Sequence, residues 1–197
     1  DWSSDVCSSD LAERGAGVLL GGERHGVLIE GFDLGNSPAE YAEPRGERLV
    51  LTTTNGTRAI LQSVAEAGTV LVGALVNAQA LVAAALAAAP ADGTIAIRCA
   101  GVRGEVALDD AYVAGVLVER LLAEWPGAFA TDGARTALAI ARAYPGALEA
   151  LADSQSARDL DGTGHEADVA RCAQLDILTT APRVVESAPG RVVVALG

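Results

Sequence analysis

Short apolar runs alternate with helical patterns along most of this chain, and that alternation limits the folds open to it. The apolar runs are continuous, which is typical of strands that are covered on both faces. The predicted strands are residues 18–20, 49–51, 70–75, 94–100 and 192–196. The predicted helices are residues 59–67, 78–89, 111–123 and 135–143, with shorter helical pieces over 147–189. We therefore expect an α/β fold whose largely parallel or mixed sheet has helices on both faces.

The beginning of the chain is expected to lie outside this fold. Residues 1–11, DWSSDVCSSDL, match the translation of a common sequencing adapter, and a flexible acidic tail is the alternative. The chain has no Met, which fits a protein whose natural start is missing. With 197 residues, of which 50% are hydrophobic, the chain suits one α/β domain. We expect this domain over residues 12–197, without its N-terminal segment.

Charge and cysteine content exclude some partners. All 14 basic residues are Arg, and the formal net charge is −12, which argues against binding nucleic acid or an anionic membrane. An anionic substrate would have to be bound by local Arg side chains and backbone amides. Beyond the first eleven residues only Cys99 and Cys172 remain, far apart and without metal-site spacing. A reduced, cytoplasmic protein is the expectation.

The stretch TTTNGTR, residues 52–58, lies where a predicted strand meets a predicted helix. Ligands of parallel sheets bind beyond the carboxyl ends of strands, and a helix N-terminus favours phosphate or carboxylate. Gly56 would let the backbone approach closely, and Arg58 adds a fixed charge. The alternative is a helix cap by Thr54 or Asn55, although a cap needs only one such residue. The stretch predicts an anion site formed by Thr53, Thr54, Asn55, Gly56, Thr57 and Arg58.

Two stretches before this turn carry further reactive groups. GGERHG, residues 21–26, places Glu23, Arg24 and His25 after a strand, where they could handle protons and oxyanions; a solvated turn is the alternative. In residues 29–41, Glu30 and Asp33 are hard oxygen donors suited to Mg²⁺. Asp33 could equally form an Asx-turn.

An acidic pair follows the predicted strand 94–100. Asp109 and Asp110 begin a predicted helix, where acids are favoured by the helix dipole without any catalytic purpose. Capping therefore accounts for at least one of the two, and a metal role requires only the other.

Taken together, several segments resemble the 2-phosphosulfolactate phosphatase family. They are, in chain order, LLGGERHG, GFDLGNSPAEY, LTTTNGTRA, VLVGALVNA, CAGVRGEVALDD and GHEADVARCAQLD. The likeness extends from about residue 19 to residue 196. Members of this family are Mg²⁺-dependent phosphatases that convert 2-phospho-3-sulfolactate to sulfolactate, a step toward coenzyme M. The resemblance therefore implies a hydrolase with a small phosphosulfonate substrate and bound Mg²⁺.

The resemblance and the residues together give a working site. The 53–58 turn would hold phosphate or sulfonate, and Arg24 would bind a second anionic group. Asp33 and Asp110 would hold Mg²⁺, with Glu23 as a base or a water-orienting group. The family begins with a strand that bears an Asp- and Arg-containing motif, which this chain lacks. If that strand supplies a ligand, the chain as given would be inactive.

Other functions stay open at this point. One is a non-catalytic α/β domain that binds a small anion, and another is a phosphatase acting on a different phosphorylated hydroxy acid. A nucleotide-binding oxidoreductase has less support, because no GxGxxG follows any predicted strand. Homo-oligomerisation is also left open.

Overall fold

The computed structural model describes residues 15, 17–24, 27–43 and 48–195. The predicted tail, residues 1–11, and His25 lie outside these residues. The chain divides into two compact units, the first ending at Arg58 and the second beginning at Ala59. The division falls within helix α2 (Gly56–Glu66), and each unit is described below by itself.

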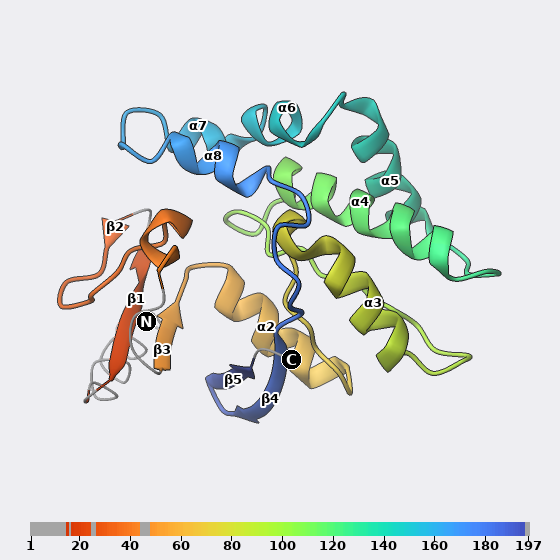
Figure 1. Ribbon diagram of the computed structural model, residues 1–197, viewed down its shortest axis with the longest axis horizontal. Coiled ribbons are helices and arrows are strands. Elements are labelled where there is room, and N and C mark those ends of the chain that lie inside the picture. The colour runs from red at the N-terminus through yellow and green to blue at the C-terminus, as the bar shows by residue number, and fades with distance from the viewer. Residues whose placement is uncertain (1–14, 16, 25–26, 44–47, 196–197) are drawn as a thin grey trace. The chain divides into compact units, whose positions relative to one another are not determined.

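The first unit contains a three-stranded mixed sheet in the order β2-β1-β3 (Figure 1). Its strands are β1 (Val18–Arg24), β2 (Val27–Leu28) and β3 (Arg48–Thr52). β1 and β3 run parallel, with Gly22 opposite Thr52, whereas β1 and β2 are antiparallel. The strands predicted at 18–20 and 49–51 are thus confirmed, and the sheet is mixed.

The loop after β2 folds back onto β1. The amides of Asp33 and Leu34 both donate to the carbonyl of Leu20, and the Gly22 amide donates to the carbonyl of Leu34. Leu20, Phe32 and Leu34 are buried. A short 3-10 helix, η1 (Pro38–Tyr41), follows and is capped by the Ser37 hydroxyl. Backbone hydrogen bonds thus hold the beginning of this loop against β1.

Most of the second unit is helical. Three long helices follow α2: α3 (Ala78–Ala88), α4 (Leu108–Glu124) and α5 (Asp132–Ala143). The shorter elements are η2 (Leu75–Asn77), α6 (Ala147–Ala152), α7 (Gln155–Asp159) and α8 (Ala167–Cys172). The chain then forms an antiparallel hairpin of β4 (Arg183–Ala188) and β5 (Arg191–Ala195). The four long predicted helices are thus confirmed to within a few residues at each end.

Helix α4 is at the centre of the packing in this unit, alongside α3, α5 and α6 (Figure 1). One face of α4 joins a buried cluster of Leu75, Tyr112, Ala150 and Leu151. Another joins a cluster of Ala78, Leu81, Val82 and Leu117. Both clusters are built mainly from aliphatic side chains, as the low aromatic content of the sequence leads one to expect.

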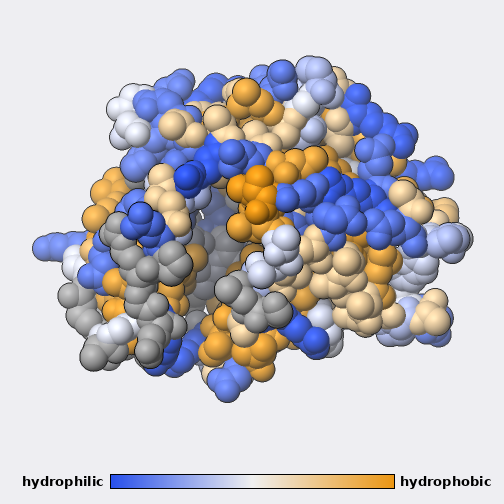
Figure 2. Space-filling view, viewed as in Figure 1, coloured by the Kyte–Doolittle hydropathy of each residue, from blue (hydrophilic) through white to orange (hydrophobic). Residues whose placement is uncertain are grey.

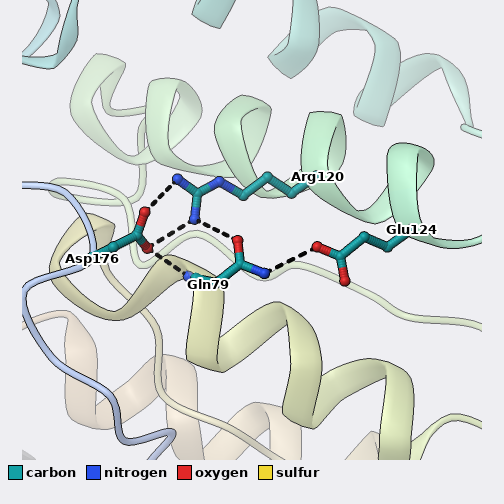
Figure 3. Close-up of polar contacts among 4 residues, drawn as sticks. All are labelled: Gln79, Arg120, Glu124 and Asp176. Atoms are coloured by element: carbon teal, nitrogen blue, oxygen red, sulfur yellow. Dashed lines mark hydrogen bonds and ion pairs between the residues drawn. The ribbon is translucent and has the colours of Figure 1, made fainter.

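A polar cluster ties three segments of the second unit together (Figure 3). Arg120 of α4 binds both oxygens of Asp176, at 2.8 and 2.6 Å. Asp176 also accepts a 2.7 Å hydrogen bond from the backbone amide of Gln79, in the first turn of α3. The Gln79 side chain donates to Glu124 at 3.0 Å. The loop before β4 is thereby joined to α3 and α4.

Two predicted strands are wrong. Residues 70–75 form only a single bridge, between Leu71 and Arg183, and residues 94–100 have no regular secondary structure. A strand requires a hydrogen-bonded neighbour, and within the described residues neither segment forms a ladder with one. β4 in turn lies inside the stretch predicted to be helical. The expectation of a single sheet with helices on both faces is not confirmed.

Apolar side chains are partly exposed on the hairpin, where Val185 and Val194 are 57% and 40% exposed (Figure 2). Among the described residues, no helix is both long enough and apolar enough to cross a membrane.

Candidate active site

The turn between β3 and α2 is held together by two of its own threonines. The Thr53 amide donates to the Thr57 hydroxyl at 3.0 Å, and the Thr57 amide donates to the Thr53 hydroxyl at 3.2 Å. The first turn of α2 is therefore capped from inside the stretch. The hydroxyl that accepts from this first turn belongs to Thr53, whereas the sequence suggested a cap by Thr54 or Asn55.

The third threonine of this turn is bound by a carboxylate. Glu23 Oε1 accepts hydrogen bonds from both the amide and the hydroxyl of Thr54, each at 3.0 Å. Glu23 is near the end of β1 and Thr54 lies just past the end of β3, so the parallel pairing of these strands brings them together. An oxyanion is thus already bound at this turn, and the protein itself supplies it.

Arg24 also lies at the ends of the two strands. Its guanidinium donates to the Glu23 carbonyl at 2.9 Å and to the hydroxyl of buried Thr52 at 3.2 Å. These contacts fix the side chain next to the turn. A cation held in this way is placed to bind a second anionic group of a ligand.

The remaining residues of the turn make fewer hydrogen bonds within the protein. Gly56 begins α2 and Arg58 is exposed. In the part of the chain that the structure describes, the Asn55 side chain and the Arg58 guanidinium form no hydrogen bond or ion pair. These two side chains are the donors that a ligand could use without displacing an internal partner.

Asp33 lies in the same unit and is anchored to β1. Its Oδ2 accepts a hydrogen bond from the Leu20 amide at 3.0 Å, and its own amide donates to the Leu20 carbonyl at 2.9 Å. The residue is exposed, so its carboxylate can be reached from solvent. The Asx-like backbone contact and a role as a ligand are compatible, because one carboxylate has several lone pairs.

The acidic pair at the start of α4, in the second unit, has two different environments. Asp110 Oδ2 accepts a 2.6 Å hydrogen bond from the Gly101 amide. Burial raises the pKa of Asp110, against the opposing effect of this hydrogen bond. Asp109 Oδ1, by contrast, is buried and has no hydrogen-bond partner among the described residues. The cap predicted for one of the two acids is not seen, because the N-cap residue of α4 is Ala107 and the printed bond of Asp110 goes to the preceding loop. The sequence had assigned the metal role to Asp110.

Two thiols lie within electrostatic reach of the acidic pair. Burial raises the pKa of Cys99, and the charges of Asp110 and Asp109 raise it further. Burial also raises the pKa of Cys172, with additional effects from Asp168 and Asp109. Both thiols are therefore protonated at neutral pH and are poor nucleophiles.

The described residues contain no group of three or more His, Cys, Asp or Glu side chains that could hold a metal ion. This does not exclude Mg²⁺, which proteins often bind through one or two carboxylates, with water and phosphate oxygens as the other ligands. Asp33 belongs to the first unit and Asp110 to the second. That the two share one ion stays a prediction.

Hydroxyl and amide donors at a strand-to-helix turn, with a fixed Arg beside them, are suited to binding a phosphate group. A family model described as 2-phosphosulpholactate phosphatase matches residues 5–187. The chain belongs to this family.

Similar proteins carry the same description. The chain is 47% identical over 178 residues to a "Probable 2-phosphosulfolactate phosphatase" of Thermus thermophilus, covering 88% of this chain and 73% of that protein. A protein of the same description from Deinococcus radiodurans is 47% identical over 171 residues, covering 85% of this chain and 70% of its own. A third, from Carboxydothermus hydrogenoformans, is 37% identical over 172 residues, covering 87% and 70%.

Proposed function

We propose that this protein hydrolyses 2-phospho-3-sulfolactate to sulfolactate and inorganic phosphate with the help of Mg²⁺. The family supports the reaction class. The observation that carries the proposal is the Glu23 carboxylate bound to the amide and hydroxyl of Thr54, because it marks the turn as a place that binds an oxyanion. The phosphate of the substrate has the same need for donors as that carboxylate.

The roles proposed for the first unit depend on which donors already form hydrogen bonds within the protein. Asn55, Gly56 and Arg58 are proposed to bind the phosphate or the sulfonate, together with the hydroxyls of the turn. The reciprocal Thr53–Thr57 pair holds the turn in shape. Arg24, fixed by the Glu23 carbonyl and Thr52, is proposed to bind a second anionic group of the substrate.

Glu23 is proposed to orient the attacking water or to accept its proton. In the reaction, the oxygen of water forms a bond to phosphorus while the bond from phosphorus to the substrate oxygen breaks, and that oxygen leaves with a proton. Donors fixed before the reaction stabilise charge on the phosphoryl oxygens without further reorganisation. The strong contacts of Glu23 with Thr54 place a carboxylate next to these donors.

The residues present fit a divalent cation. Asp109 Oδ1 is buried and has no hydrogen-bond partner among the described residues, so it is free to bind such a cation. Asp33, in the first unit, is a second carboxylate suited to a metal, whereas Asp110 accepts a hydrogen bond from the Gly101 amide. A bound Mg²⁺ would neutralise charge on the phosphoryl oxygens.

Phosphate release from 2-phospho-3-sulfolactate, measured with Mg²⁺ and with excess EDTA, tests the proposal. We expect release only with Mg²⁺. Other phosphorylated hydroxy acids, such as phospholactate and phosphoglycerate, should react more slowly, because they lack the sulfonate. Binding of sulfolactate without any phosphate release would instead support a non-catalytic anion-binding domain.

The variant Arg58→Ala tests the turn itself. Loss of one charge-assisted contact to the transition state costs about 2–4 kcal/mol, so kcat/KM should fall by well over tenfold. Arg142→Ala is the matched control, because Arg142 is an exposed residue of α5 paired with Glu119. Wild-type kinetics of Arg58→Ala would refute its assignment.

A further inference from the structure

We infer that Asp109, and not its neighbour Asp110, is the carboxylate at the start of α4 that binds a divalent cation. The need for such a cation rests on the proposed function. The assignment itself rests on the different hydrogen bonding of the two side chains. Sequence reasoning could not make this distinction, because adjacent acids in a first helical turn are equally favoured by the helix dipole.

The Asp110 side chain is hydrogen-bonded to the backbone. Its Oδ2 accepts the 2.6 Å hydrogen bond from the Gly101 amide, which ties the first turn of α4 to the loop that precedes it. That loop is itself closed by paired backbone hydrogen bonds between Val102 and Glu105, at 3.1 and 2.9 Å. Asp110 therefore has a structural role that a metal ligand would have to give up.

Asp109 Oδ1 forms no such hydrogen bond. This oxygen is buried and accepts no hydrogen bond from any described residue. A buried carboxylate oxygen without a partner is strongly unfavourable, so native proteins rarely retain one unless an ion, a water or a ligand meets it.

The surroundings of Asp109 favour a cation from solution over a partner within the chain. The groups within its electrostatic reach include the Asp110 carboxyl and the thiols of Cys99 and Cys172, none of which carries positive charge. Arg171 lies near Cys172, but it donates no hydrogen bond to Asp109 Oδ1. A negative, partly buried position of this kind attracts a small cation.

The class of cation follows from the number of ligands. No three ligating side chains of the described residues come together, so a tetrahedral zinc site is excluded within this part of the chain. Mg²⁺ and Mn²⁺ retain several waters and need only one or two protein carboxylates. The site we infer is therefore a hydrated Mg²⁺ or Mn²⁺ bound directly by Asp109.

The experiment compares the isosteric variants Asp109→Asn and Asp110→Asn, which remove the same charge one residue apart. Mn²⁺ binding is followed by electron paramagnetic resonance without any substrate. We expect Asp109→Asn to weaken Mn²⁺ binding by about tenfold or more, and Asp110→Asn by no more than about threefold. The inference is wrong if Asp110→Asn gives the larger loss, if both losses are equal, or if the wild-type protein binds no Mn²⁺.

A second measurement separates a metal ligand from a structural residue. Without metal, Asp109→Asn should unfold at the same temperature as the wild type or higher, because it replaces a carboxylate whose buried Oδ1 has no hydrogen-bond partner among the described residues. Asp110→Ala should unfold at a lower temperature, because the Gly101 amide loses its acceptor. Added Mg²⁺ should raise the unfolding temperature of the wild type and of Asp110→Ala, but not that of Asp109→Asn. A lower unfolding temperature for metal-free Asp109→Asn, with the Mg²⁺ effect retained, would overturn the inference.

The two proposals can fail independently. Mn²⁺ binding that depends on Asp109, without phosphate release from the wild type, would support the site and refute the proposed function. Phosphate release without Mn²⁺ binding would refute the site alone.

Discussion

Glu23 accepts two hydrogen bonds from Thr54 through a single carboxylate oxygen, one from the amide and one from the hydroxyl, both at 3.0 Å. The two residues are 31 positions apart in the chain. The contact has two consequences for a substrate that binds at this turn. It pre-orients the donors, and its negative charge repels the phosphate that would approach them.

Glu23→Gln separates these two effects. Gln retains an acceptor oxygen for Thr54 but removes the negative charge, so inorganic phosphate should bind more tightly, by about fivefold or less for a partly exposed charge. Isothermal titration calorimetry with phosphate measures this directly. If Glu23 also serves as the base, kcat of the same variant should fall while KM falls too.

Glu30→Gln is the matched control, because it removes the same charge from an exposed residue of the same unit. Phosphate affinity should barely change in this variant. Equal gains in Glu23→Gln and Glu30→Gln would mean that only the net charge of the protein matters. A weaker affinity in Glu23→Gln would show that the carboxylate helps the phosphate to bind.

Thr57→Val tests the reciprocal pair that shapes the turn. The Thr57 hydroxyl accepts the Thr53 amide, and Val removes that acceptor while keeping the shape of the side chain. The free energy of unfolding should fall by about 1 kcal/mol, because the Thr53 amide loses its acceptor. Urea denaturation measures it. Thr136→Val is the control, since the hydroxyl of Thr136 only bonds back to Asp132 within exposed α5, and its loss should change stability by less than about 0.5 kcal/mol.

The sequence predicts the helices and the strands β1 and β3 because these depend on local patterns. The alternation of apolar runs and helical segments is enough to place α2, α3, α4 and α5. The strand at 94–100 fails because an apolar run states only that a segment is suited to a sheet, and not which neighbour it has. The hairpin of β4 and β5 had a usable signal, because Pro189–Gly190 separates two Val-rich runs.

The site shows the same division between local and long-range information. That TTTNGTR caps a helix follows from its composition, but which threonine is the cap depends on where α2 begins. The contact of Glu23 with Thr54 depends on the register that sets Gly22 opposite Thr52, which no local pattern contains. The contrast between Asp109 and Asp110 likewise depends on the rotation of α4 about its axis, which sets the direction of each side chain.

The pair of Arg120 and Asp176 predicts how stability depends on pH. Hydrogen bonding from Arg120 lowers the pKa of Asp176 below its ordinary value of 3.8. A lowered pKa in the folded state stabilises the protein above the ordinary pKa, and this stability is lost as the pH falls through the lowered value. Asp176→Asn should therefore reduce the unfolding free energy at pH 7 by about 1 kcal/mol, and by progressively less below about pH 4.

Urea denaturation of the wild type and of Asp176→Asn between pH 2.5 and pH 7 measures this difference. Asp161→Asn is the control, because Asp161 is exposed and its carboxylate makes no hydrogen bond or ion pair with the described residues. A difference that stays constant down to the lowest pH would show that the effect of Asp176 is not electrostatic.

Two helical glycines, Gly115 and Gly133, should respond in opposite ways to the same substitution. Gly115 lies where α4 meets α5, and a Cβ added there would overlap the carbonyl of Ala137 and crowd the Cβ of Ala141. Gly115→Ala should lower the unfolding free energy by about 1–3 kcal/mol, because the two helices must move apart. Gly133 lies in α5, and a Cβ added there would make only an ordinary contact with the Thr131 hydroxyl, at 4.0 Å. Gly133→Ala should therefore raise stability by about 0.4–1 kcal/mol through the entropy of the unfolded chain. Thermal and urea unfolding of both variants measure the contrast, and equal stabilisation by the two would show that α4 and α5 do not pack this closely in solution.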